Sequence, residues 1–423
     1  MTHPGFAVIG SGVSGLTAAH LLRRHGRTTL YEADTRLGGH AHTHDLPGSP
    51  GSPASGVDSG FIVHNERTYP LLTGLFRELG VATRENEMSM SVACGGCGLE
   101  YAGARGLSGL LARRPTVAYL RMLAQVPRFH RAARALLDGR DVFGGALPEA
   151  DPTVGEFLRA GGFSGHFTAH FAKPLVAAVW SCPPGTAMDY PARHLFAFLA
   201  NHGMLSVGGS PRWRTVVGGS RVYVERIAAG LPEVLQGTPV RAVIRHADGV
   251  DVVDASGTTR TYAAAVIATH ADQALGLLPD PSADEKRVLG AFTYSRNPTV
   301  LHSDASVLPR AKAARASWNY TMDSCAADVD RARVSYDMNR LQGLPGPERY
   351  LVTLNGAVPE RHVRARMVYE HPVFTRESVA AQKELPGLSG GRLAFAGAHH
   401  GWGFHEDGCR SGFAAARALG AIP

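Results

Sequence analysis

Long apolar runs are missing from this chain of 423 residues, although 44% of its residues are hydrophobic. No stretch of about 18 apolar residues occurs, which excludes a hydrophobic membrane-spanning helix. The N-terminal region also lacks the charged and then apolar segments of a secretory signal peptide. We therefore expect a soluble globular protein of the cytoplasm, with contact at the inner membrane face as the one alternative.

Cysteine is scarce, and its five positions do not suggest a disulfide framework, because they are scattered and odd in number. They are Cys94, Cys97, Cys182, Cys325 and Cys409. Cys94 and Cys97 form a CxxC motif, but the sequence offers no second pair of this kind to complete a zinc site. The sequence therefore predicts no metal site.

Acidic residues are rare between Arg105 and Arg140, where eight arginines stand beside a single acid, Asp138. The whole chain carries 43 basic and 36 acidic residues, a net charge of +7. Leucines recur through this stretch at helical spacing, so it is either a basic amphipathic surface for anionic lipid or a solvated helical face. We favour the solvated face. No nucleic-acid partner is expected, since no aromatic platform accompanies the charge.

A glycine-rich turn follows the first apolar strand. Phe6 to Ile9 leads directly into Gly10-Ser11-Gly12-Val13-Ser14-Gly15, and a helical stretch comes next. The first glycine permits a tight turn, the second lets a diphosphate approach the backbone, and the third allows helix and strand to pack closely. The pattern predicts a dinucleotide held at the N-terminus of a helix.

An acid and a second glycine pair narrow the choice of dinucleotide. Glu32 ends the second strand, 22 residues beyond Gly10, near the ~20 expected of a carboxylate that binds a ribose. The segment from Arg36 to Gly39 reads R-x-G-G, an extension seen in many FAD proteins. Only one dinucleotide fingerprint is present, so no separate nicotinamide domain is expected. These features favour FAD over NAD.

The remaining sequence predicts strands and helices in separate blocks. Residues 100–205 are expected to be mostly helical, with breaks at Pro115, Pro127, Pro174 and the pair Pro183-Pro184. Three alternating segments between 240 and 262 predict a β-meander, and Arg392 to Ala396 a buried strand. A last helix is expected from Gly408 to Leu419.

Several longer motifs carry a family resemblance. With the glycine turn, Glu32 and R-x-G-G, they resemble the flavin amine oxidase and phytoene-desaturase superfamily. More narrowly, they look like a bacterial NAD/FAD-binding, amine-oxidase-like branch that is also similar to the N-terminal half of plant cyclopropane-fatty-acid synthases. The motifs are Val57 to Val63, Asn65 to Pro70, Trp213 to Val216, Tyr336 to Gln342 and Gly403 to Gly408.

The resemblance implies an α/β fold in which a discontinuous, Rossmann-like FAD-binding domain with a β-meander contains an inserted α+β substrate domain. Residues 1–85, 216–275 and 376–423 would form the FAD-binding domain. Residues 86–215 and 276–375 would form the substrate domain.

The resemblance also implies which residues hold the cofactor. The ADP part would be bound by Gly10, Gly12, Gly15 and Glu32, with the diphosphate side at Arg36, Gly38 and Gly39. Val240 would present its backbone to the adenine, while Gly397, Glu406, Asp407 and Gly408 would reach the ribityl chain and the flavin. Physical reasoning adds that Asp407 can cap a helix from Gly408, whose dipole would stabilise a reduced flavin.

The candidate catalytic residues lie in the same C-terminal segment: His400, Trp402, Phe404 and His405. Many members of the family that this chain resembles place two aromatic rings as a cage before the flavin. Phe404 matches one of these rings, and Trp402 or His400 could supply the other. A histidine here could act as a general base or simply pack beside the flavin. His40, His42 and His44 alternate after the glycine pair, and they either line the same cavity or lie exposed on a strand.

Two departures weaken amine oxidation as the specific reaction. Many amine oxidases have Gly-Glu where this chain has Gly397-Ala398, and the lysine that often holds a water near flavin N5 has no clear counterpart.

The resulting hypothesis is an FAD-dependent oxidoreductase that moves hydride from a substrate C–H bond to flavin N5. The substrate would be a small, largely apolar molecule, either a lipid or polyene oxidised at CH–CH or a compound oxidised at CH–NH. Oxygen is a candidate electron acceptor. An amine oxidase proper, a redox-neutral flavin isomerase and, less favoured, a non-enzymatic flavin-bound partner protein remain as alternatives. The oligomeric state and any covalent flavin link stay open.

Overall fold

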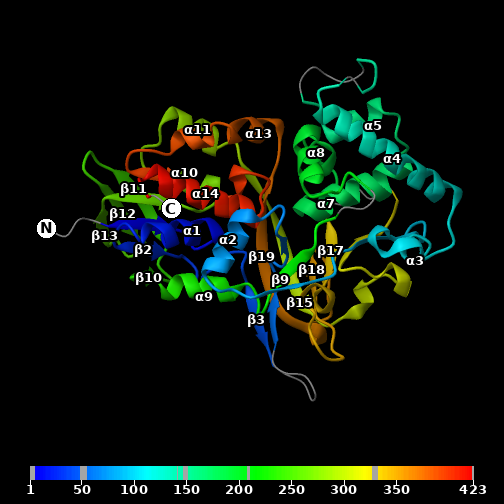
Figure 1. Ribbon diagram of the computed structural model, residues 1–423, viewed down its shortest axis with the longest axis horizontal. Coiled ribbons are helices and arrows are strands. Elements are labelled where there is room, and N and C mark those ends of the chain that lie inside the picture. Colours follow the sequence, from blue (N-terminus) through cyan, green and yellow to red (C-terminus); the bar gives the residue numbers. More distant parts are fainter. Residues whose placement is uncertain are drawn as a thin grey trace.

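The computed structural model describes residues 5–47, 55–140, 142–145, 151–206, 210–325 and 332–421. Figure 1 shows one lobe that carries both ends of the chain and a second, largely helical lobe, with long strands between them. No helix within the described ranges is long and apolar enough to cross a membrane.

The first lobe is built on a parallel sheet of five strands in the order β10-β2-β1-β14-β20. Its strands come from distant parts of the sequence, which fits the discontinuous domain that the resemblance implied. The central strands are buried along nearly their whole length, because helices cover both faces of such a sheet. The strands are β1 (Phe6–Ile9), β2 (Thr28–Tyr31), β10 (Glu233–Leu235), β14 (Ala264–Ile267) and β20 (Leu393–Phe395).

The first and last long helices of this lobe pack directly on each other. They are α1 (Val13–Leu22) and α14 (His405–Ala418). A Cβ added to Gly408 would lie 2.6 Å from Cγ1 of Val13, and one added to Gly412 would lie 2.3 Å from the carbonyl oxygen of Ser14. Two glycines on α14 therefore let the backbones approach closely.

The prediction that the last helix begins at Gly408 is wrong, because α14 begins at His405. The carboxylate of Asp407 accepts hydrogen bonds from the backbone N–H groups of Trp402, at 3.0 Å, and Phe404, at 3.1 Å. Asp407 thus sits inside the first turn and reaches back to the residues before it, as acids in a first turn commonly do.

The predicted meander is confirmed, and further helices complete this lobe. The meander strands are β11 (Val240–Arg245), β12 (Val250–Asp254) and β13 (Thr259–Tyr262), paired antiparallel. The helices are α2 (Pro70–Glu78), α9 (Arg221–Ala229), α10 (Ala271–Gly276), α11 (Ala283–Leu289) and α13 (Arg376–Gln382).

A sheet of seven strands forms the base of the second lobe, in the order β19-β15-β18-β17-β16-β7-β8. All neighbours run antiparallel except β16 and β7, which are parallel. The strands are β7 (Met90–Cys94), β8 (Glu100–Ala102), β15 (Thr293–His302), β16 (Trp318–Met322), β17 (Arg333–Asp337), β18 (Leu351–Leu354) and β19 (Val363–Val373).

Helices cover this sheet, as expected for residues 100–205. They are α3 (Gly106–Leu110), α4 (Val117–Leu137), α5 (Val154–Ala160), α6 (Gly165–Phe167), α7 (Lys173–Trp180) and α8 (Ala192–Asn201), with α12 (Met338–Gln342) after β17. The break predicted at Pro127 is wrong, since α4 continues through it. Phe129, two residues further, is buried among several phenylalanine rings, and this packing offsets the missing backbone hydrogen bond.

Two small sheets lie where the lobes meet. One pairs β3 (Thr43–Leu46) with β4 (Ser55–Asp58), and the other has the order β5-β9-β6. In the second, β9 (Trp213–Val216) lies between β5 (His64–Asn65) and β6 (Thr83–Glu85). Asp58, at the end of β4, is buried and accepts hydrogen bonds from the backbone and the side chain of Ser220.

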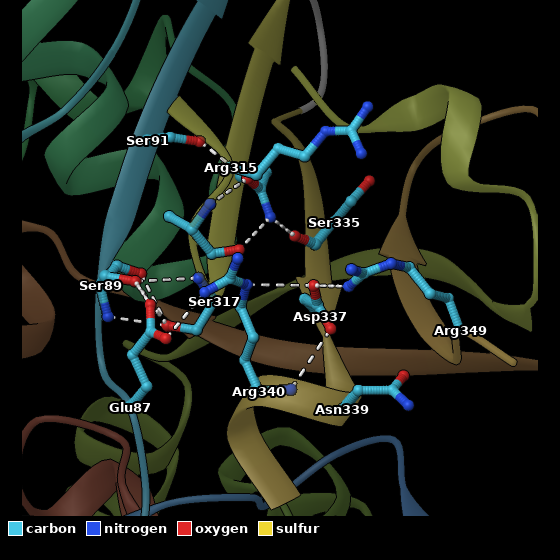
Figure 2. A network of polar contacts seen from close by, with 12 residues as sticks. Glu87, Ser89, Ser91, Arg315, Ser317, Ser335, Asp337, Asn339, Arg340 and Arg349 are labelled. Carbon is cyan, nitrogen blue, oxygen red and sulfur yellow. Dashed lines mark hydrogen bonds and ion pairs between the residues drawn. The ribbon is translucent and has the colours of Figure 1, made fainter. Parts of the chain in front are cut away.

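A polar network fixes the register of the second sheet (Figure 2). The backbone N–H of Ser89 donates to Oγ of Ser317 at 2.7 Å, and that hydroxyl donates back to the carbonyl of Ser89 at 2.8 Å. Asp337 is 1% exposed and accepts from the backbone N–H of Arg340 and from Nη1 of Arg349. The motif from Tyr336 to Gln342 therefore supports the fold, because its acid caps α12 and neutralises two arginines.

We expect Gly412→Ala to destabilise the protein by about 1–3 kcal/mol, since its methyl group would meet a backbone carbonyl of α1. The matched control is Gly74→Ala in α2, where an added Cβ meets no described atom within 4 Å. That change should stabilise by about 0.5–1 kcal/mol through helix propensity. Urea unfolding measures both, and equal effects would contradict the close packing of α1 on α14.

Candidate functional site

The glycine turn after β1 has three glycines with different surroundings. Gly10 has φ +99°, and a Cβ there would lie 2.7 Å from the carbonyl oxygen of Ala268. A Cβ at Gly15 would lie 1.9 Å from the carbonyl oxygen of Gly10. At Gly12, in contrast, it would meet no described atom within 4 Å. The fold itself requires the first and third glycines, whereas the second faces open space.

Glu32 and the R-x-G-G segment converge on this turn. Oε2 of Glu32 accepts hydrogen bonds from the backbone N–H, at 2.9 Å, and the hydroxyl of Ser11. The N–H of Gly38 donates to Oγ of Ser11 at 3.0 Å. A Cβ on Gly39 would lie 3.3 Å from Cα of Gly12. The structure thus brings these predicted residues together around the N-terminus of α1, where the helix dipole favours an anion.

Arg36 and Val240 lie at the edge of the same region. Burial lowers the pKa of His42 and of His44, and the nearby guanidinium of Arg36 lowers both further. Val240 begins β11, and the backbone N–H of Thr238 before it donates to the carbonyl of Glu32 at 2.8 Å. The meander is therefore tied to the strand end that carries Glu32.

The C-terminal segment approaches the site from the other side. The N–H of Gly397 donates to Oγ of Ser411 at 2.9 Å, and a Cβ there would clash with the ring of His399. Burial raises the pKa of Asp407 to about 6. Gly408 faces Val13, the first residue of α1. These contacts hold the segment against the N-terminus of α1.

Glu406 has a structural contact that the sequence did not indicate. Its two carboxylate oxygens accept hydrogen bonds from the backbone N–H groups of Leu71 and Leu72, both at 3.0 Å. These N–H groups belong to the first turn of α2, where backbone donors lack partners within the helix. Glu406 therefore caps α2, and its carboxylate is occupied by protein groups.

The four candidate catalytic residues divide into two groups. His405 is buried in the first lobe, where its ring stacks on Phe61 with centroids 3.7 Å apart and Nε2 lies 3.2 Å from the hydroxyl of Tyr223. Burial lowers the pKa of His405 to about 3, so this ring stays neutral. His405 thus packs in the core beside the site.

Trp402 and Phe404 point toward the helices of the second lobe. The carbonyl of Trp402 accepts a hydrogen bond from Nε1 of Trp180 at 2.9 Å. The ring of Phe404 stacks on Phe198 with centroids 4.9 Å apart, and Phe374 packs near Trp180. The C-terminal segment therefore joins an aromatic cluster made of residues from α7, α8 and the end of β19.

Buried histidines gather near this segment. Nε2 of His40 and Nε2 of His400 are buried and have no hydrogen-bond partner within the described part of the chain. The ring of His40 lies 5.1 Å from Tyr369 and 5.3 Å from His371. Burial lowers the pKa of His371 and His400 to about 4 and that of His40 well below its usual value. These rings are neutral near pH 7.

Tyr369 and His371 were missed by sequence reasoning. Both belong to β19, where alternate residues share a face, and this face meets His40 and His42. The hydroxyl of Tyr369 lies 2.9 Å from Nδ1 of His42 and 2.6 Å from Oγ of Ser59. The alternation of Tyr369 and His371 was the available signal, but only the sheet shows which face turns toward the first lobe.

These observations fit FAD. Three features suit a diphosphate: the open space at Gly12, the close approach of Gly39 to the backbone of Gly12, and the start of α1, which no side chain of the described residues caps. The buried unpartnered nitrogens of His40 and His400 are groups that a polar ring system can satisfy.

We expect Gly12→Ala to leave the apoprotein as stable as the parent but to weaken FAD binding about tenfold or more, that is by ~1.4 kcal/mol. Gly12 has φ −60° and ψ 172°, which alanine adopts readily, and its Cβ would project toward the diphosphate. Fluorescence titration with FAD measures the affinity. Gly10→Ala is the contrasting control, because it should destabilise the apoprotein itself. Unchanged affinity in Gly12→Ala would contradict the diphosphate position.

We expect the apoprotein to lose at least ~2 kcal/mol of stability between pH 6.5 and pH 4. Histidines such as His371, His400 and His405 have folded pKa values of about 3 to 4, so in this range the unfolded chain binds more protons. Asp58 and Asp407, with pKa values of about 6, act in the opposite direction but are fewer. Urea unfolding at both pH values measures the change, and constant stability would refute neutral buried histidines.

Comparison with known proteins agrees with the geometry. The model of the flavin containing amine oxidoreductase family matches residues 13–300. Tryptophan 2-monooxygenase of Allorhizobium ampelinum is 51% identical over 49 residues, which cover 11% of this chain and only 7% of that protein.

Solved structures resemble the whole chain at low identity. Cyclohexylamine oxidase from Brevibacterium oxydans superimposes with a TM-score of 0.68 at 16% identity, covering 99% of this chain and 98% of the other. A CLA-producing fatty acid isomerase from P. acnes gives a TM-score of 0.65 at 14% identity, covering 98% of each chain. These likenesses confirm the predicted fold class, and the family match confirms FAD as the predicted cofactor. The chain belongs to the flavin-containing amine oxidoreductase family.

Proposed function

We propose that the protein is an FAD-dependent oxidoreductase that takes hydride from a C–H bond of an apolar, lipid-like or polyene substrate. The observation that carries the proposal is the position of Trp402 and Phe404. Both aromatic side chains reach from the first lobe into the second, where the rings of Trp402 and Phe404 each contact Phe198, with centroids 5.9 and 4.9 Å away.

The surroundings of this cluster suit an apolar chain better than a cation. Both nearby carboxylates are occupied, Asp407 by backbone N–H groups and Glu406 by the start of α2. The nearby histidines, including His400, are held neutral by burial. Removing apolar surface from water contributes ~25 cal/mol per Å², so an alkyl chain would bind here without a charged partner.

FAD held at the glycine turn would supply the hydride acceptor. The residues of the chain would orient the substrate and exclude water. Phe404 and Trp402 would form the apolar wall beside the reacting carbon. His400 is neutral and has an unpartnered Nε2, so it can accept a proton from the substrate. The N-terminal end of α14, where the helix dipole is positive, would stabilise negative charge.

A redox-neutral isomerase is the second candidate, in which hydride returns to the same substrate. Two observations favour it: the structural likeness to a fatty acid isomerase, and the neutral, aromatic lining of the cluster.

Peripheral membrane contact would suit either reaction. Leu107, Leu111, Val117 and Leu120 are at least half exposed in the arginine-rich stretch of α3 and α4.

The test mixes the purified holoprotein, without oxygen, with unsaturated fatty acids or with primary amines. We expect the fatty acids to bleach the flavin absorbance, and oxygen to restore it with release of peroxide. Bleaching by amines alone would overturn the lipid proposal. If a rearranged fatty acid forms without oxygen consumption, the reaction is isomerisation and not oxidation.

We expect Phe404→Ala to slow flavin reduction by the substrate at least about tenfold, equivalent to ~1.4 kcal/mol of the barrier, while FAD stays bound. In the proposal, the ring of Phe404 forms part of the wall that contacts the substrate, and its stacking on Phe198 fixes its orientation. Phe404→Leu, which keeps an apolar side chain of similar bulk, should recover most of the rate. Stopped-flow absorbance measures both, and equal rates in parent and alanine variant would remove Phe404 from the substrate site.

A further inference from the structure

The CxxC motif has partners that the sequence did not reveal. The four ligand atoms of Cys94, Cys97, His170 and Cys325 all lie within 4.8 Å of one another. Cys325 is more than 200 residues beyond the motif and lies in a turn after β16, while His170 lies in a helical segment between α6 and α7. The expectation that the motif stands alone is therefore wrong, because the fold supplies one more thiol and an imidazole.

We propose that four side chains bind one zinc ion in a tetrahedral structural site: Cys94, Cys97, His170 and Cys325. Three thiolates and one imidazole form a common set of zinc ligands. The site lies in the second lobe, away from the glycine turn, and has no part in the proposed oxidation.

Two of the six distances between ligand atoms match the edges of a zinc tetrahedron, and all six are no longer than 4.8 Å. With Zn–S bonds of ~2.3 Å and a Zn–N bond of ~2.0 Å, a tetrahedron has sulfur–sulfur edges of ~3.8 Å and sulfur–nitrogen edges of ~3.5 Å. The Sγ atoms of Cys94 and Cys325 are 3.7 Å apart, and Sγ of Cys97 is 3.5 Å from Nε2 of His170. A disulfide would require ~2.05 Å between the two sulfurs. The arrangement fits a shared ion better than a bond between two thiols.

The histidine is oriented for metal binding. Nδ1 of His170 lies 3.2 Å from the carbonyl oxygen of His166 and donates to it, which leaves Nε2 with a lone pair directed at Cys97. A hydrogen bond from the second ring nitrogen to a carbonyl is the usual support for a zinc-binding histidine. His170 lies within a π-helical segment, residues Thr168–Ala172, and such wide turns are frequent at binding sites.

Glycines let the cysteine turns approach each other. A Cβ on Gly96 would lie 3.0 Å from the backbone N of Cys325, and one on Gly95 would lie 2.9 Å from the carbonyl oxygen of Asp323. The N–H of Gly95 also donates to the carbonyl of Met322 at 2.8 Å. Larger residues at these two positions would separate the turns, so both glycines preserve the distance between the thiols.

A metal here would hold the helical layer to the sheet. Two ligands come from the β7–β8 turn, one from the turn after β16, and His170 comes from the segment that continues into α7. The last residue of α7 is Trp180, whose indole donates to the carbonyl of Trp402. The zinc site would thus fix one end of the helix whose other end contacts the C-terminal segment.

The first experiment measures metal in the full-length protein, purified under reducing conditions and then reconstituted with zinc. We expect one zinc per chain by mass spectrometry of metals. Cobalt substituted for zinc should give the visible d–d absorption and the thiolate-to-cobalt band of a tetrahedral site. Three results would overturn the proposal. They are less than half an equivalent of bound zinc, one equivalent of iron in its place, and a disulfide between Cys94 and Cys325.

Variants assign the ligands. His170→Gln and Cys97→Ser should each lose most of the bound metal, and the exposed position of Cys97 makes a folding defect from the side-chain change itself improbable. Cys182→Ala is the matched control, because this buried cysteine lies outside the cluster and its variant should keep the metal. Circular dichroism checks that all three variants fold. Folded His170→Gln and Cys97→Ser proteins that keep a full equivalent of zinc would contradict the assignment.

Discussion

The close contact of α1 with α14 is the constraint on which the site depends. It brings the two ends of a long chain together, so the glycine turn at residues 10–15 faces the segment at residues 397–408. The contact requires backbone approach at Gly408 and Gly412, which side chains would prevent. The same contact places the N-terminal ends of both helices on one region, and their dipoles add there.

Burial governs the chemistry of the residues around this region. Histidines such as His40, His371 and His400 lie inside the protein, and desolvation holds them neutral. The acids of the C-terminal segment are held by backbone N–H groups, so their carboxylates organise helix ends within the protein. In the proposed reaction, this arrangement would supply an apolar wall for the substrate and a neutral base.

Local patterns predicted the cofactor half of the molecule well. The turn, Glu32 and the R-x-G-G segment lie within 40 residues, and each needs only short-range geometry to bind a dinucleotide. Patterns were less informative for the C-terminal segment. Glu406 was predicted to reach the flavin, and the sequence did not indicate that its carboxylate caps α2, a helix more than 300 residues earlier. The start of α14 was misplaced because Asp407 reaches backward rather than forward.

The sequence by itself determined the glycine turn, the parallel sheet and the meander, because these follow from glycine sterics and from alternation along single strands. Only the tertiary structure decided which distant side chains meet. It placed Trp402 and Phe404 against α8, set His371 beside His40, and brought Cys325 and His170 to the CxxC turn. The physical reason is that such contacts depend on how sheets and helices pack, and spacing along the chain does not encode that packing.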